Sequence, residues 1–195
     1  MVALNGKPQP VNLPGIDPVI MLSRVFLMLA LPLLVAQPPA SWRKFTPKDG
    51  SFSVSLPAVP KETKQSLKLA DVSVEVTMFL CEVPGDGAKR GDGAYVVSVT
   101  EYPPQEVQGG EEQRLRNARD GAVQNSKGKL FHERKIALDG HPGRELWIKT
   151  GEDDMIHARM VAVKQRLYQT MAIGPKNFVE TKETAAFMDS FKLKK

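Results

Sequence analysis

The fold is decided by residues 130–173, whose sequence is LFHERKIALDGHPGRELWIKTGEDDMIHARMVAVKQRLYQTMAI. Strand-like runs follow one another in this stretch, and turn-forming segments separate them at 139–143, 151–154 and 165–166. Because strands joined by such short turns pair antiparallel, we expect an antiparallel meander. Its four strands are expected at Leu130–Leu138, Arg144–Thr150, Ile156–Val163 and Leu167–Ile173.

More strands are expected on the N-terminal side of this meander. Trp42–Phe45 and Phe52–Leu56 flank the turn sequence Pro47-Lys48-Asp49-Gly50, so we expect them to form a hairpin. Val72–Leu80 alternates apolar with polar residues, which is typical of a strand with one buried face. Two further strands are expected at Lys61–Leu69 and Tyr95–Thr100.

Two helices interrupt the strand pattern. From Glu111 to Ser126, apolar residues recur at helical spacing, which predicts an amphipathic helix. Asn177 and Glu180 have the spacing of a capping box, so we expect a last helix to begin there and to end near Ser190. An antiparallel sheet packed by helices on its faces belongs to the α+β class.

Several motifs resemble those of a known group of proteins. They are Trp42-Arg43-Lys44-Phe45, Gly50-x-Phe52-x-Val54-x-Leu56-Pro57, Gly140-x-x-Gly143-Arg144-Glu145-Leu146, Arg159, Leu167-Tyr168 ahead of Gly174, and Phe187-x-x-Ser190-Phe191. With these motifs the chain resembles secreted bacterial proteins of the PsbP-like fold, which the extrinsic subunit PsbP of photosystem II shares. The resemblance covers nearly all of residues 42–192 and implies an α/β/α sandwich. It carries over no ligand-binding or partner-binding position.

Residues 21–36 have the pattern of a secretory signal peptide. Arg24 precedes an apolar run of 12 residues from Val25 to Ala36, and the run ends at Gln37-Pro38-Pro39-Ala40. A membrane-spanning helix needs about 20 apolar residues, so this run is too short. We therefore expect an exported protein, periplasmic or extracellular, with no integral membrane span in its mature chain. Retention of this segment as an anchor is the alternative.

The other domain boundaries follow from the signal segment. Residues 1–20 are Pro-rich and without periodicity, so we expect either that the chain starts at Met21 or that 1–20 is a disordered extension. Residues 37–41 are expected to be a linker, and residues 42–195 a single α+β domain.

The distribution of charges along the sequence argues against a nucleic-acid-binding protein. The chain has 27 Lys and Arg and 22 Asp and Glu, a net charge of +5, and loss of residues 1–36 leaves +4. These charges are interspersed, whereas nucleic-acid binders gather theirs into a patch or stripe. The small positive excess is compatible with peripheral association with an anionic membrane or cell wall.

Motifs of the common enzyme classes are absent from the sequence. It contains no Gly-x-Ser-x-Gly, no phosphate-binding loop and no dinucleotide fingerprint, so we expect no catalytic and no cofactor-binding residues. The histidines, His132, His141 and His157, lack metal-ligand spacing, so we expect no metal site. Cys81 is the only cysteine, which excludes an intramolecular disulfide and predicts a small buried residue.

The segment 84–93 is rich in Gly and Asp and contains Arg90-Gly91-Asp92. We expect a surface hairpin loop here, and we keep Arg90, Gly91 and Asp92 as a candidate interaction loop.

These observations favour one functional hypothesis and leave two alternatives. The leading hypothesis is an exported, non-enzymatic binding or accessory domain that acts on a protein or envelope partner. The first alternative is an enzyme whose site is assembled from dispersed residues such as Cys81, His157 and Glu145. The second is a carrier for a small apolar ligand between helix and sheet. The enzyme hypothesis predicts that those three side chains meet in a pocket.

Overall fold

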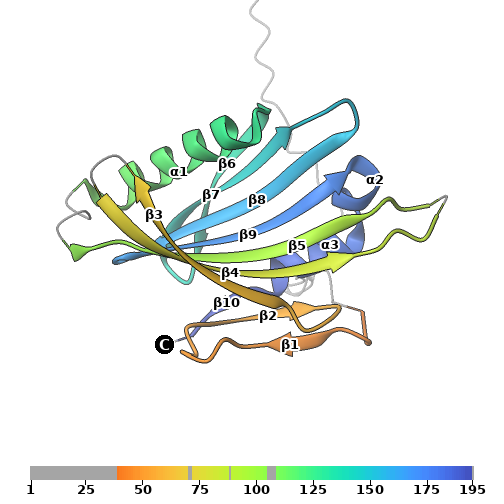
Figure 1. The fold of residues 1–195 in the computed structure, drawn as a ribbon, viewed down its shortest axis with the longest axis horizontal. Helices are drawn as coiled ribbons and strands as arrows, with labels where there is room; N and C mark the ends of the chain where they lie inside the picture. Colours follow the sequence, from red (N-terminus) through yellow and green to blue (C-terminus); the bar gives the residue numbers. More distant parts are fainter. Residues whose placement is uncertain (1–38, 70–71, 88, 105–108, 195) are drawn as a thin grey trace, which may run out of the picture. The chain divides into compact units, whose positions relative to one another are not determined.

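The centre of the fold is a seven-stranded antiparallel sheet with the strand order β3-β4-β5-β9-β8-β7-β6 (Figure 1). The structure is a computed structural model that describes residues 39–69, 72–87, 89–104 and 109–194. The strands are β3 (Lys61–Leu69), β4 (Val72–Val83), β5 (Gly93–Glu101), β6 (Lys129–Leu138), β7 (His141–Lys149), β8 (Asp154–Val163) and β9 (Arg166–Pro175).

The predicted meander is present as β6–β7–β8–β9, each strand antiparallel to the next. Its first turn is tighter than expected, because β7 already begins at His141 and only Asp139 and Gly140 lie between the strands. Both have positive φ, 50° and 82°, which is the backbone of the two-residue turn that suits strand twist. This turn fixes the register of β6 against β7.

One face of the sheet is covered by the C-terminal helices and a small second sheet. The helices are α2 (Lys176–Val179) and α3 (Lys182–Ser190), and the second sheet consists of β1 (Arg43–Phe45), β2 (Phe52–Leu56) and β10 (Lys192–Leu193). The predicted hairpin of Trp42–Phe45 and Phe52–Leu56 is the β1–β2 pair. Its core joins Phe52 and Phe187 to Tyr95, Phe79 and Val97 of the large sheet.

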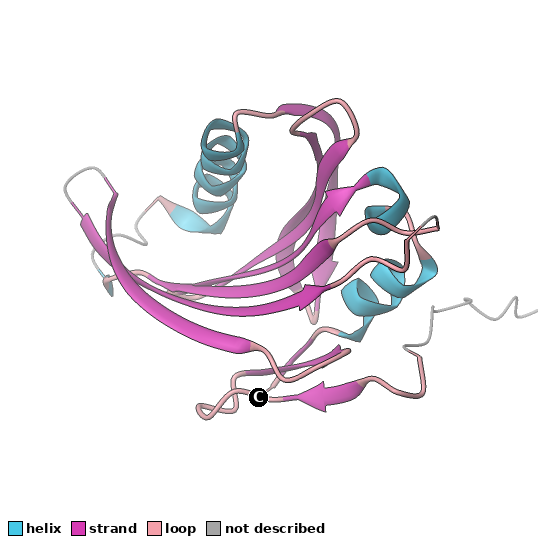
Figure 2. Cartoon of the chain, turned by 45° about the vertical axis from the view of Figure 1, so that its right-hand side comes forward, coloured by secondary structure: helices cyan, strands magenta, loops and turns pink. Residues whose placement is uncertain are grey.

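The opposite face of the sheet is covered by α1 (Gly110–Ser126), which packs on β7 and β8. Figure 2 shows the sheet curving around this helix, with α2 and α3 on the other side. Leu115 of α1 is fully buried against Leu146, Ile148 and Met160. Helices therefore lie on both faces of an antiparallel sheet, which confirms the α+β class and the expected sandwich.

The predicted start of the last helix is wrong. The chain makes a single helical turn in α2 and then starts α3 at a new N-cap, Thr181, whose side chain accepts a hydrogen bond from the Thr184 N–H. Asn177 caps no helix, because its Oδ1 accepts a hydrogen bond from the backbone N–H of Gly91 instead, at 3.1 Å. A long-range contact has thus replaced the local one that the capping-box spacing suggested.

The predictions for the N-terminal segments lie outside the described residues. These are the extension at 1–20, the signal peptide at 21–36 and the first part of the linker at 37–41. Among the residues that the structure does describe, no helix has both the length and the apolar character needed to cross a membrane.

Candidate functional site

Two rows of side chains cross strands β6, β7 and β8 on the face of the sheet that carries α3. In the first row, Trp147 of β7 is paired with His132 of β6 on one side and with His157 of β8 on the other. The indole ring stacks on His157, with centroids 4.4 Å apart and planes 12° apart, and meets the His132 ring edge-on at 4.8 Å. Two of the histidines therefore flank one tryptophan.

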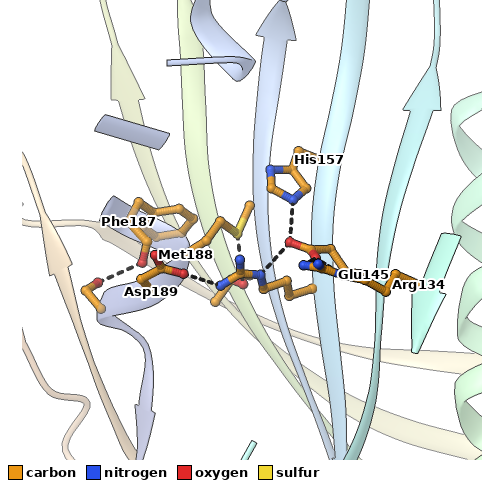
Figure 3. Close-up of polar contacts among 9 residues, drawn as sticks. Arg134, Glu145, His157, Phe187, Met188 and Asp189 are labelled. Atoms are coloured by element: carbon orange, nitrogen blue, oxygen red, sulfur yellow. Dashed lines mark hydrogen bonds and ion pairs between the residues drawn. The ribbon is translucent and has the colours of Figure 1, made fainter. Parts of the chain in front are cut away.

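The second row consists of charged residues centred on Glu145. The register places Arg134 of β6 and Arg159 of β8 directly opposite Glu145 of β7. Arg134 donates through Nε at 3.1 Å and also through Nη2, and Arg159 donates through Nε at 2.6 Å. His157 Nε2 lies 2.9 Å from Oε1 of this carboxylate, the oxygen that Arg159 also contacts, and Figure 3 shows His157 beside Glu145.

The row continues from the sheet into α3. Arg159 Nη1 donates to Asp189 Oδ1 at 2.7 Å, so Arg159 bridges the Glu145 carboxylate and the last turn of the helix. Burial of Arg159 acts to lower its pKa. The hydrogen bonds and charges of Asp189 and Glu145 have the larger, opposite effect, so the pKa of Arg159 is raised. The guanidinium is therefore fixed in place on two sides.

Glu145 is held as an ion although only 1% of it is exposed. Burial raises its pKa, but hydrogen bonds from His157 and Arg159, with the charge of Arg159, lower the pKa from 4.5 to about 2. At neutral pH the carboxylate is ionised and surrounded by donors. It therefore serves to orient the two arginines.

A pocket of about 190 Å³ lies beside these arginines, between β6, β8, β9 and α3. Its charged lining residues are Arg134 and Arg159, and most of the remaining lining is apolar. The apolar part includes Ile136, Val161, Tyr168, Met188 and Phe191. The side chain of Arg134 is 60% exposed, so the charged side of the pocket reaches the surface.

The structure brings together two of the three residues named in the enzyme hypothesis. Glu145 and His157 are in contact, whereas Cys81 lies on β4, and two strands separate β4 from β8. Three inter-strand steps of about 4.8 Å put Cys81 roughly 14 Å from His157. The Cys81 thiol is buried, where its Sγ is 3.9 Å from the Ala58 carbonyl, and burial raises its pKa. The expected buried cysteine is therefore found, but the three groups do not meet.

The remaining histidine, His141, starts β7 at the turn and is separate from the other two. Within the described parts of the chain, no three His, Cys, Asp or Glu side chains form a group that could hold a metal ion.

The candidate interaction loop of Arg90, Gly91 and Asp92 connects β4 to β5. Its polar groups bond to the loop itself and to α2: Asp92 Oδ1 accepts from the Gly85 N–H at 2.7 Å, and Gly91 donates to Asn177. The Arg90 guanidinium donates to the Pro84 carbonyl at 3.1 Å. The loop is thus a folded turn beside α2, away from the Glu145 row.

Sequence reasoning had named Glu145 and His157 but missed Arg134, Arg159 and Asp189 as site residues. Opposite charges at Arg134 and Glu145 become neighbours only once the β6–β7 turn is known to contain two residues. The turn length could have revealed this pairing, but the longer turn expected at 139–143 predicts a different register.

Comparisons with known proteins bear on the fold. No family model and no curated protein matches the sequence. The structure is similar to cyanobacterial PsbP from Synechocystis, with a TM-score of 0.50 and 14% identity over 80% of this chain and 94% of that chain. It is also similar to a Pseudomonas aeruginosa protein of unknown function, with a TM-score of 0.40 and 13% identity over 71% of this chain and 85% of that one.

The likeness to PsbP shows that the chain has a PsbP-like fold, as the sequence motifs had indicated. At 14% identity it shows the fold alone, because one fold serves many functions.

Proposed function

We propose that this chain is an exported, non-enzymatic binding domain that acts on a protein or envelope partner, and that its binding site is the pocket beside Arg134 and Arg159. One observation carries the proposal. Both guanidinium groups line the pocket, and both are fixed by hydrogen bonds to carboxylates. Glu145 binds both arginines, and Asp189 also binds Arg159. Donors that are already oriented lose little freedom when a ligand binds, which favours recognition.

The state of the titratable groups supports binding over catalysis. A general base works best when its pKa lies near the working pH, and the pKa of Glu145 is about 2. A nucleophilic cysteine needs a lowered pKa and access to solvent, whereas Cys81 is buried and its pKa is raised. Glu145 is therefore unsuited to act as a general base, and Cys81 is unsuited to act as a nucleophile.

The export part of the proposal rests on the signal-peptide pattern at residues 21–36. An exported domain with a single buried cysteine depends on its core for stability. An aromatic-rich cluster on one face of the sheet and an aliphatic cluster on the other supply that core. Periplasmic or extracellular exposure would give the pocket access to envelope components.

A second candidate function, a carrier for a small apolar ligand, is favoured by the position of the pocket between α3 and the sheet. Most of its lining is apolar, as such a carrier needs. Both candidates use the same pocket, so they differ in what occupies it.

The test is photo-crosslinking in cells that express the full chain. A photoreactive residue replaces His132, which is exposed and lies two residues from Arg134 on the same face of β6. The control position is Asn117, exposed on α1 across the sheet. We expect an adduct of defined mass from position 132 and none from position 117. We also expect the adduct from position 132 to disappear when residues 1–36 are deleted. Equal adducts from both positions would contradict the assigned site, and an adduct that survives the deletion would contradict export.

A further inference from the structure

Each of the two arginines keeps one terminal nitrogen available. Arg134 uses Nε and Nη2 on Glu145, and its Nη1 bonds no described residue. Arg159 uses Nε on Glu145 and Nη1 on Asp189, and its Nη2 bonds no described residue. A guanidinium nitrogen can only donate, so each of these two nitrogens can donate to an acceptor on a bound ligand.

The charged groups that line the pocket are hydrogen-bond donors, and they favour an anion. Arg134 and Arg159 are its charged lining residues, and a guanidinium keeps its charge at any physiological pH. Glu145 and Asp189 hold these groups without themselves lining the pocket. An anionic acceptor gains charge-assisted hydrogen bonds from these guanidinium groups, and a cation gains none.

The size and lining of the pocket limit the rest of the ligand. A dry cavity of about 150 Å³ accommodates benzene. The volume here, about 190 Å³, leaves room for a body of that size and for one small polar group. Val161, Tyr168, Met188 and Phe191 offer that body apolar contacts.

We infer that the pocket binds a carboxylate carried on a small apolar body, such as one aromatic ring or a short alkyl chain. The carboxylate lies against Arg134 and Arg159, and the apolar body lies between the sheet and α3. This inference rests on the pocket being the binding site of the proposed function. The carboxylate comes either from a free organic acid or from the C-terminus of a chain that ends in an apolar residue.

The first experiment titrates the full-length protein with phenylacetate, phenylacetamide and inorganic phosphate, by calorimetry or by NMR shifts. Phenylacetate is expected to bind about tenfold more tightly than phenylacetamide, because a hydrogen bond to a charged group is the stronger one. Phosphate has the charge but no apolar body, so it should bind more weakly than phenylacetate. Equal affinities for the acid and the amide would overturn the inference, as would tighter binding of phosphate.

A matched pair of variants locates the binding. Arg134→Gln removes a lining charge, and Lys135→Gln removes the neighbouring charge, which lies on the opposite face of β6. We expect phenylacetate to bind about tenfold more weakly to Arg134→Gln and equally well to Lys135→Gln. Equal affinity for both variants would overturn the assignment to this pocket. Since the amide comparison uses the unaltered protein, the inference stays testable even if a variant fails to fold.

A third arm distinguishes the two sources of the carboxylate. The probe is a short peptide ending in Phe with a free C-terminus, and its control is the same peptide with an amidated C-terminus. Tighter binding of the free peptide than of phenylacetate assigns the site to a chain end, and the reverse assigns it to a free acid. If no acid is preferred over its amide, the inference fails, whereas the crosslinking experiment, which uses no added acid, tests the proposed function separately.

Discussion

Glu145 is almost completely buried and yet ionised, which makes it the residue on which the site depends. A buried charge is stable only when its environment supplies opposite charges and hydrogen bonds. Arg134 and Arg159 supply both, and His157 supplies a further hydrogen bond, all from the two neighbouring strands. In return the carboxylate fixes the orientation of both arginines at the pocket.

Replacement of Glu145 tests this role through the pH dependence of stability. Its folded-state pKa, about 2, is below the usual 4.5, so its contribution is complete above pH 4.5 and is lost as the pH falls toward 2. Glu145→Gln should therefore cost about 3 kcal/mol at neutral pH, because it removes the buried carboxylate that pairs with both Arg134 and Arg159. This difference from the unaltered protein should shrink steadily on acidification.

Urea unfolding at a series of pH values measures the effect, with Glu152→Gln as the control because Glu152 is exposed in the turn before β8. A Glu145→Gln deficit that stays constant from neutral to acid pH would show that the carboxylate does not act as a paired ion.

For single residues, the sequence patterns predict burial more successfully than they predict which side chains are in contact. They correctly predicted that Cys81 is a small buried residue, since cysteines without a disulfide partner usually are. They also predicted that Glu145 and His157 meet, but in a pocket that would include Cys81 as well. The distance between β4 and β8 depends on the strand order of the sheet, which residue types do not specify.

Among the elements, the β6–β7 hairpin controls the site. Its two-residue turn at Asp139 and Gly140 sets Arg134 opposite Glu145, and a change of one residue in turn length would move one of them to the other face. The strands themselves were predictable from their turn-bounded, strand-like runs. The register was not, because it depends on one or two residues at the turn.

The junction between α2 and α3 offers a prediction at the level of an element. Thr181→Ala removes the N-cap of α3 and should lower the free energy of unfolding by about 1 kcal/mol. Asn177→Ala removes only an exposed hydrogen bond to Gly91 and should cost less. Urea unfolding of both variants compares them directly. A larger loss from Asn177→Ala would mean that the helix is capped where the capping-box spacing had suggested.

For the whole molecule, the two faces of the sheet have different roles. The α1 face is packed by aliphatic residues around Leu115, and an ion pair between Arg144 and Glu112 ties the helix to β7. The other face carries the aromatic core, α3 and the pocket. The PsbP-like fold itself was predictable from motifs, because turns and core positions leave a sequence signature. The pocket was not, because its residues come from three strands and a helix.

The central claim is that the pocket beside Arg134 is the surface through which this domain binds its partner. Capture from a gently extracted envelope fraction tests it most directly, with the unaltered protein, Arg134→Gln and Lys135→Gln immobilised side by side. Both substitutions remove one positive charge from adjacent positions of β6, and only Arg134 lines the pocket. The account predicts a partner that the unaltered protein and Lys135→Gln retain and that Arg134→Gln loses. Equal retention by all three proteins, or capture of no partner by any of them, would contradict it.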